Sequence, residues 1–120
     1  MPIMPANKGF DASQLDLLFA TIAERKGRDP KSSYTASLLA KGPQKCAEKM
    51  GEEAVETIIA AVSGSRQEAI SESADLLYHW LVLTASLDIN PAEVYGELAR
   101  REGTSGLDEK ASRSPDPSDD

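Results

Sequence analysis

Apolar residues recur at helical intervals along most of the chain, and turn-forming residues divide this pattern into segments. The first segment, residues 13–27, has Ser13 as its expected N-cap and a glycine as its stop. A short second helix is expected over residues 34–42. Pro43 is then well placed as the first residue of a long helix that runs to about Val62. The first half of the chain therefore predicts three helices.

The second half of the chain continues the pattern of caps followed by helices. Ser65 and Glu68 form a predicted capping box, and the helix behind it runs to about Leu87. Asn90 is the expected N-cap of a last helix, with Pro91 in its first turn. Because no segment alternates convincingly in the manner of a strand, the sequence predicts an all-α fold, a helical bundle of four to five helices.

The two ends of the chain differ in composition from its middle. With 120 residues, the chain is long enough for one domain with one hydrophobic core. We expect residues 13–113 to form that domain and residues 1–12 to be a flexible N-terminus. Residues 114–120 are rich in proline, serine and aspartate, so we expect a disordered acidic tail there.

Charge and composition exclude several functions. The net charge of -7 argues against a general nucleic-acid surface, because phosphate backbones attract basic faces. No apolar run approaches the roughly 20 residues of a membrane span, and the N-terminus lacks the features of a signal peptide. The single cysteine, Cys46, rules out an internal disulfide and is expected to be a small core residue. We therefore expect a cytoplasmic protein that binds neither nucleic acid nor membrane.

The helix expected over residues 43–62 separates apolar from charged side chains. One side carries lysines and glutamates, and the opposite side is expected to face the core, as in any half-buried helix. The apolar side consists of Ala47, Met50, Ala54, Ile58 and Ala61.

An aspartate stands at the start of an apolar helical segment. Residues 76–87 hold no acid or base apart from His79, so this helix should be buried on several sides. Asp75 precedes that run, and Glu72 lies three residues earlier on the same side of the helix. Because a buried, unpaired carboxylate is costly, we expect Asp75 to be paired or metal-bound.

Two antiparallel helices joined by a short turn would bring the acids of both helices into one groove. Carboxylates gathered in this way repel one another unless a cation neutralises them. Oxygen ligands without a second histidine or a cysteine cluster favour a hard ion, so we predict Mg²⁺, with Mn²⁺ as the alternative. The five candidate residues are Glu52, Glu53, Glu56, Glu72 and Asp75.

The order of these acids, Glu-Glu-x-x-Glu and then Glu-x-x-Asp, resembles the motif of the all-α nucleoside triphosphate pyrophosphohydrolases, the MazG-like superfamily. The stretches "SYTASLLAKG", "ESADLLYH" and "ELARREGTSGLDEKASR" resemble, more narrowly, the phosphoribosyl-ATP pyrophosphohydrolase family of histidine biosynthesis. The resemblance covers roughly residues 13–113. It implies the Mg²⁺-dependent hydrolysis of phosphoribosyl-ATP to phosphoribosyl-AMP and pyrophosphate, the second step of that pathway.

The resemblance also implies roles for the acids. A phosphoryl-type displacement needs charge neutralisation and alignment more than covalent help. Glu52 is either a further ligand or the base that orients the attacking water. The expected metal ligands are Glu53, Glu56, Glu72 and Asp75.

Basic residues near the acids are candidates for phosphate contact. Lys45 and Lys49 lie one and two turns before the acids, and we favour phosphate contact for at least one of them over i,i+4 salt bridges. The C-terminal segment is rich in glycine, serine and basic residues and could fold over an anionic ligand. Its candidate residues are Arg100, Arg101, Lys110 and Arg113.

Several aromatic side chains lie close to the acids in the sequence. His79 is able to hydrogen-bond Asp75 across one helical turn, although a satisfied core histidine is the more common outcome. Tyr34 is a candidate for ligand contact because its short helix lies near a break in the pattern. Tyr78 and Trp80 are expected to pack in the core.

Short helices in a single chain of this size bury little surface. We therefore expect a homodimer with helices packed across a two-fold axis, and the resemblance implies the same, with sites near the subunit interface. Two other functions stay open at this point. One is a house-cleaning pyrophosphohydrolase that acts on dUTP or damaged nucleotides, and the other is a non-catalytic helical module that binds metal or dimerises.

Overall fold

The computed structural model describes residues 9–103 and 110–111 of the chain. Within these residues the secondary structure consists of helices without strands, which confirms the all-α prediction. None of the described helices combines the length and the apolar character needed to cross a membrane. The five helices are α1 (Ser13–Arg25), α2 (Tyr34–Lys41), α3 (Pro43–Ser63), α4 (Arg66–Ser86) and α5 (Pro91–Arg101).

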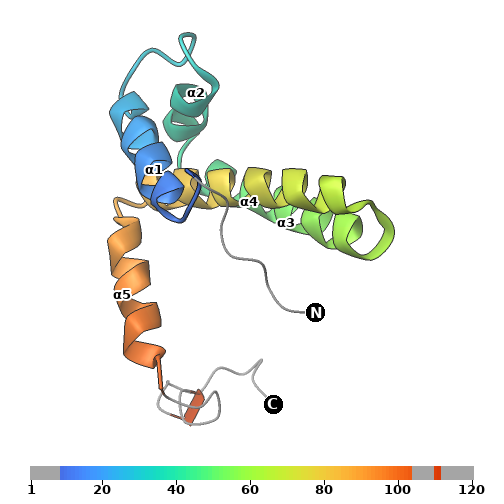
Figure 1. Ribbon diagram of the computed structural model, residues 1–120. Helices are drawn as coiled ribbons and strands as arrows, with labels where there is room; N and C mark the ends of the chain where they lie inside the picture. Colours follow the sequence, from blue (N-terminus) through green and yellow to red (C-terminus); the bar gives the residue numbers. More distant parts are fainter. Residues whose placement is uncertain (1–8, 104–109, 112–120) are drawn as a thin grey trace.

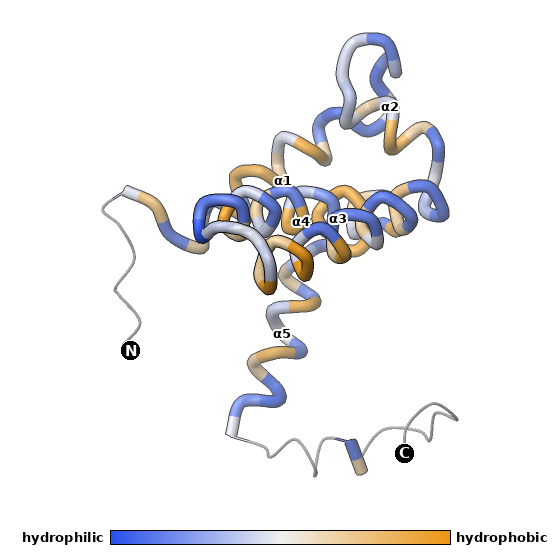
Figure 2. The backbone as a smooth tube through the Cα atoms, turned by 90° about the vertical axis from the view of Figure 1, so that its right-hand side faces the viewer, coloured by the Kyte–Doolittle hydropathy of each residue, from blue (hydrophilic) through white to orange (hydrophobic). Residues whose placement is uncertain are grey.

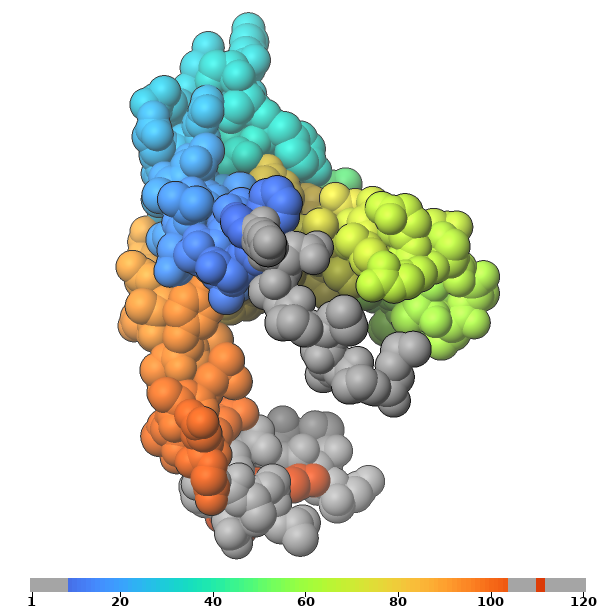
Figure 3. Space-filling view, viewed as in Figure 1, coloured from blue at the N-terminus to red at the C-terminus, as the bar shows by residue number. Residues whose placement is uncertain are grey.

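The two longest helices, α3 and α4, form an antiparallel hairpin that projects from the rest of the molecule. Figure 1 shows α1 and α2 against the base of this hairpin, while α5 leads away from the same base in another direction. The hairpin tip and α5 therefore diverge, as the space-filling view in Figure 3 shows. The fold is a small helical core with two projecting arms.

The hydrophobic core lies at the base of the hairpin, where four helices meet. Ile22 of α1, Leu38 of α2 and Leu81 of α4 are almost completely buried there. Cys46, near the start of α3, is buried with them, and its thiol donates a hydrogen bond to the carbonyl oxygen of Leu38 at 3.4 Å. The expectation that Cys46 is a core residue is confirmed.

The helix boundaries agree with the sequence prediction, but two caps differ in detail. Ser13 is the first residue of α1, not its N-cap, which is Ala12; the Asp11 carboxylate accepts from the Ser13 backbone N–H at 2.9 Å. Ser65 does cap α4, because its hydroxyl accepts from the Glu68 backbone N–H at 3.1 Å. The Glu68 carboxylate contacts the Ser65 hydroxyl and not its backbone, so the reciprocal half of the predicted box is missing.

The expectation that Asn90 caps the last helix is confirmed, and Asn90 also forms a complete capping box with Glu93. Asn90 accepts from Ala92, and Glu93 reaches back to the Asn90 backbone N–H at 2.9 Å. Gly42, between α2 and α3, has a φ of 91°, in the region that favours glycine. It allows α3 to begin at Pro43 directly after α2 ends.

The apolar side predicted for α3 is not the side that packs on α4. Ile58, from that predicted side, is 62% exposed, whereas Cys46 and Ala60 are buried. The hairpin packs through the flank of α3 that carries Glu53 and Thr57, and the Thr57 hydroxyl donates to the Glu72 carbonyl oxygen at 3.1 Å. The prediction was wrong for the single chain because two flanks of α3 are apolar enough to pack, and α4 covers only one.

The uncovered flank of α3 forms a continuous apolar stripe. Its residues recur at i, i+3, i+4 and i+7, so they lie on one side of the helix. All are more than half exposed, and Val62 reaches 80%. Figure 2, which looks at the hairpin from its tip, shows hydrophobic positions interspersed with hydrophilic ones on both of its helices. The stripe consists of Val55, Ile58, Ile59 and Val62.

Candidate metal site between α3 and α4

Three carboxylates from both helices of the hairpin meet in one place. Glu53 and Glu56 lie one turn apart on α3, and Glu72 faces them from α4. One oxygen from each lies within 4.8 Å of the others. The Thr57 hydroxyl lies between the two helices at this level, 2.8 Å from the Glu53 carbonyl oxygen of its own helix and 3.1 Å from the Glu72 carbonyl oxygen of α4. The structure thus brings together three of the five acids that the sequence singled out.

Two of these carboxylates are poorly satisfied by the protein itself. The Oε2 atoms of Glu53 and Glu72 are buried and have no hydrogen-bond partner. Burial raises the pKa of Glu53, and the nearby charges of Glu56 and Asp75 raise it further. The pKa of Glu72 is also raised, first by burial and then by Glu56. Both groups would be relieved by a bound cation.

The donor set fits the ion that the sequence predicted. All three residues offer carboxylate oxygens, which suit Mg²⁺ or Mn²⁺ better than zinc. A divalent ion would also satisfy the partnerless oxygens of Glu53 and Glu72. The arrangement is therefore suited to a hard cation.

Asp75 lies at the edge of this cluster and not in a buried position. The expectation of burial was wrong, because its side chain is exposed while the apolar residues after it turn toward the core. It is outside the group of three, yet its charge contributes to the raised pKa values of Glu53 and Glu72. Its assignment as a metal ligand stays a prediction.

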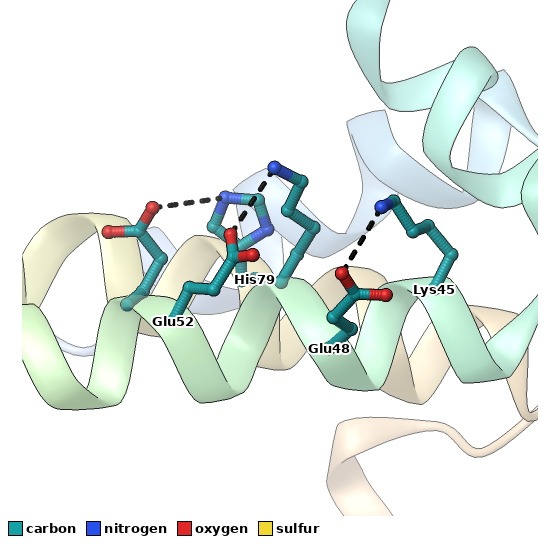
Figure 4. A network of polar contacts seen from close by, with 6 residues as sticks. Lys45, Glu48, Glu52 and His79 are labelled. Carbon is teal, nitrogen blue, oxygen red and sulfur yellow. Dashed lines mark hydrogen bonds and ion pairs between the residues drawn. The ribbon is translucent and has the colours of Figure 1, made fainter.

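The lysines before the acids are paired along α3. Lys45 Nζ lies 3.3 Å from Glu48, and Lys49 Nζ lies 3.3 Å from Glu52. These are i,i+3 pairs, not the i,i+4 pairs considered from the sequence, and Figure 4 shows them on the same stretch of α3. Glu52 is exposed and points toward Lys49, outside the group of three acids.

The C-terminal basic candidates lie elsewhere. Arg100 and Arg101 are on α5, where both contact Glu97, at 2.7 and 2.9 Å. Figure 1 shows α5 running away from the hairpin, so the single chain does not bring these arginines to the acids. Lys110 lies in the short described stretch 110–111, and Arg113 lies outside the described residues, as do residues 1–8, 104–109 and the 114–120 tail.

Two of the aromatic candidates pack as expected, the ligand contact expected of Tyr34 stays a prediction, and His79 differs from its expectation. The Tyr78 hydroxyl pairs with Thr35 at 2.5 Å, and Trp80 packs against Tyr95, so both serve packing. Tyr34 is 56% exposed and stands edge-on to His79, at 6.3 Å between ring centroids. His79 faces Glu53, not Asp75, with Nε2 at 4.0 Å from Glu53 Oε1.

Sequence reasoning missed two residues near the acids. Thr57 was not considered, although a hydroxyl one turn after Glu53 is well placed to join α3 to α4. Glu68 was read only as a cap, yet with Glu56 and Glu72 it lines a groove of about 220 Å³ toward the hairpin tip. Both roles depend on how α3 and α4 are aligned against each other, and the sequence alone does not give this alignment.

The fold and the site together place the protein in a class: all-α proteins with an acidic site between two antiparallel helices. The chain belongs to the phosphoribosyl-ATP pyrophosphohydrolase family, whose profile matches residues 15–102. That range includes α2, α3 and α4, and with them all five acidic candidates.

Curated relatives agree with this assignment over nearly their whole lengths. The phosphoribosyl-ATP pyrophosphatase of Parvibaculum lavamentivorans is 69% identical over 103 residues, which cover 86% of this chain and 94% of the relative. The protein of the same name from Dinoroseobacter shibae is 65% identical over 101 residues, 84% of this chain and 99% of the relative. That of Cereibacter sphaeroides is 62% identical over 101 residues, 84% and 98% respectively.

Proposed function

We propose that the protein hydrolyses phosphoribosyl-ATP to phosphoribosyl-AMP and pyrophosphate in histidine biosynthesis, with Mg²⁺ at the acidic site of the α3–α4 hairpin. The observation that carries the proposal is the meeting of Glu53, Glu56 and Glu72 within 4.8 Å, inside the segment that matches the family. The substrate follows from the names of the relatives, which are phosphoribosyl-ATP pyrophosphatases.

In this proposal four of the acids bind the cation, and the role of the fifth has two alternatives. Glu53, Glu56 and Glu72 hold the cation, and Asp75 completes the set from the exposed edge. When bound, Mg²⁺ supplies charge neutralisation for the triphosphate and lowers the pKa of a coordinated water. Glu52 is either a further ligand or the group that orients the attacking water, and its exposed position leaves it accessible for both tasks.

In this proposal at least one of the two lysines of α3 contacts a phosphate group. Lys45 and Lys49 each hold only an exposed glutamate at 3.3 Å, a pairing that contributes little to stability. Exchanging such a partner for a phosphate oxygen therefore costs little. The C-terminal segment supplies further candidates for phosphate contact. They would reach the acids only if this segment folded back or if a second subunit supplied them. These candidates are Arg100, Arg101, Lys110 and Arg113.

The functional unit in this proposal is a homodimer. The stripe of Val55, Ile58, Ile59 and Val62 is uncovered on a hairpin only two helices thick. A second hairpin packed against it would complete a four-helix bundle, the usual solution for helices with two apolar flanks. We place the protein in the cytoplasm, with the other enzymes of a biosynthetic pathway.

The test is pyrophosphate release from phosphoribosyl-ATP, with and without Mg²⁺, beside ATP and dUTP under identical conditions. The proposal predicts Mg²⁺-dependent release with a strong preference for phosphoribosyl-ATP. Equal or better turnover of dUTP would replace the biosynthetic role with nucleotide house-cleaning. No turnover of any of the three would leave a non-catalytic helical module.

A further inference from the structure

His79 of α4 is the only histidine of the chain, and its ring lies near Tyr34 of α2 and Glu53 of α3. The residue is 6% exposed. Tyr78 stands edge-on to it at 4.9 Å between ring centroids, and Tyr34 of α2 does so at 6.3 Å. These edge-on contacts pack the ring against α2 and against the neighbouring residue of its own helix.

The two ring nitrogens have different surroundings. Nε2 points toward α3 and lies 4.0 Å from Glu53 Oε1, as Figure 4 shows. Nδ1 is buried and has no hydrogen-bond partner. A proton on Nδ1 would thus be a buried donor without an acceptor, whereas a bare Nδ1 costs less. The surroundings favour Nε2, which is directed at Glu53, as the ring nitrogen that carries the proton.

The separation of 4.0 Å is about 1 Å longer than a hydrogen bond. Contacts of this kind in a catalytic site tighten when its ligands bind. A rotation of the Glu53 side chain would have to close this gap, and Glu53 Oε2 has no hydrogen-bond partner that the rotation would break.

We propose that His79 is a positioning residue, whose Nε2–H holds Glu53 Oε1 and so directs Glu53 Oε2 to a cation shared with Glu56 and Glu72. The inference rests on the proposed function and deepens it, because it names the residue that orients one ligand. Removal of a group that hydrogen-bonds to a metal ligand and so orients it typically lowers metal affinity by about 10–100-fold. A histidine that served only to fill the core would not affect cation binding.

Two variants of similar polarity separate these roles. In His79→Gln the amide nitrogen takes the place of Nε2 and can still donate to Glu53. In His79→Asn the amide ends near the place of Nδ1 and cannot reach Glu53. Titration with Mn²⁺ alone should give an affinity within about 3-fold of wild type for His79→Gln, and a loss of about 10–100-fold for His79→Asn. Equal affinities for both variants would overturn the proposal.

A measurement on the unchanged protein decides the matter if either variant fails to fold. Since the chain has one histidine, untagged protein with isotope-labelled histidine gives one pair of ring nitrogen NMR signals. We expect Nε2 to carry the proton, and a shift of both signals when Mg²⁺ is added. A proton on Nδ1 would refute the positioning role. So would ring signals that do not shift on addition of Mg²⁺ while the Mn²⁺ titration shows binding.

These results also separate this inference from the function on which it rests. If the wild type binds no Mn²⁺ and releases no pyrophosphate from phosphoribosyl-ATP, the proposed function fails and the positioning role fails with it. If the wild type binds Mn²⁺ and His79→Asn binds it equally well, only the positioning role fails.

Discussion

At the scale of single residues, the buried oxygens of Glu53 and Glu72 oppose the stability of the cation-free chain. Replacing Glu72 by Gln removes a charge from a site where burial and Glu56 disfavour it. Because Glu72 is a proposed cation ligand, we expect Glu72→Gln to raise the Tm measured in EDTA and to lower Mg²⁺-dependent turnover by more than about 100-fold, a larger loss than removal of a group that only orients a ligand. Differential scanning calorimetry and pyrophosphate release measure the two effects.

Glu48→Gln is the matched control for that experiment. Glu48 lies on the same hairpin, is exposed and pairs only with Lys45. Its replacement should change neither the Tm in EDTA nor the requirement for Mg²⁺ by a measurable amount. A Glu72→Gln variant that behaved like Glu48→Gln in both assays would contradict the placement of the site.

The acids themselves could be predicted from the sequence, but their surroundings could not. Helical spacing places Glu53 and Glu56 one turn apart, and a short turn brings Glu72 opposite them. Whether Asp75 is buried depends on how α4 is rotated against α1 and α3, which its own all-round apolar pattern leaves open. The approach of His79 to Glu53 likewise requires the register of the hairpin.

At the scale of elements, the turn between α3 and α4 constrains the site through Gly64. A Cβ at this position would lie 2.9 Å from the Ala60 carbonyl oxygen and 2.9 Å from Glu68 Oε2. We expect Gly64→Ala to destabilise the protein by about 1–3 kcal/mol through overpacking against the backbone. Urea denaturation measures this change.

Gly96 offers the contrasting case in α5. A Cβ there meets nothing within 4 Å, and the residue lies inside a helix. Gly96→Ala should therefore stabilise the protein by up to about 1 kcal/mol through better helix propensity. If Gly64→Ala raised the urea midpoint as Gly96→Ala should, the packing described for Gly64 would be wrong.

The stability of α5 should depend on acid pH through Glu97. Hydrogen bonds and ion pairs with Arg100 and Arg101 lower the pKa of Glu97 from 4.5 to about 2. Because the folded-state pKa is the lower one, the carboxylate favours the helix fully above the unfolded pKa, and this contribution is lost as the pH falls through about 2. Far-UV circular dichroism should show less helix in Glu97→Gln than in wild type at neutral pH.

The pH dependence of the difference between Glu97→Gln and wild type tests whether the charge of Glu97 causes it. The difference in helix content should shrink as the pH falls from 4.5 toward 2 and be absent below it. A constant difference across this range would mean that Glu97 supports α5 by packing and not by charge.

The ends of the elements were predictable where local chemistry determines them. Asn90 with Glu93 starts α5, and Pro43 after Gly42 starts α3, because caps act within a few residues. The buried flank of α3 was not predictable in the same way. Its pattern has apolar residues on more than one side, and only the position of α4 decides which of them is covered.

At the scale of the whole molecule, the uncovered stripe of α3 predicts a homodimer that depends on the hairpin. An apolar residue at the centre of an interface typically contributes about 2 kcal/mol or more, and a buried unpaired charge in its place costs further. Ile58 occupies the middle of the stripe and is 62% exposed in the single chain. We expect wild type to sediment as a dimer and Ile58→Glu as a monomer at the same concentration, with helix content preserved.

Leu17→Glu serves as the control, since Leu17 on α1 is equally exposed at 62% but lies outside the stripe. It should remain dimeric, because a single exposed leucine is normal on a protein surface. Analytical ultracentrifugation across a range of concentrations distinguishes the two variants. A monomeric wild type, or an Ile58→Glu variant that dimerises as wild type does, would mean that the stripe is not the surface through which the subunits meet. Because the acids lie on the same hairpin, loss of the dimer should also lower turnover if the partner supplies phosphate contacts.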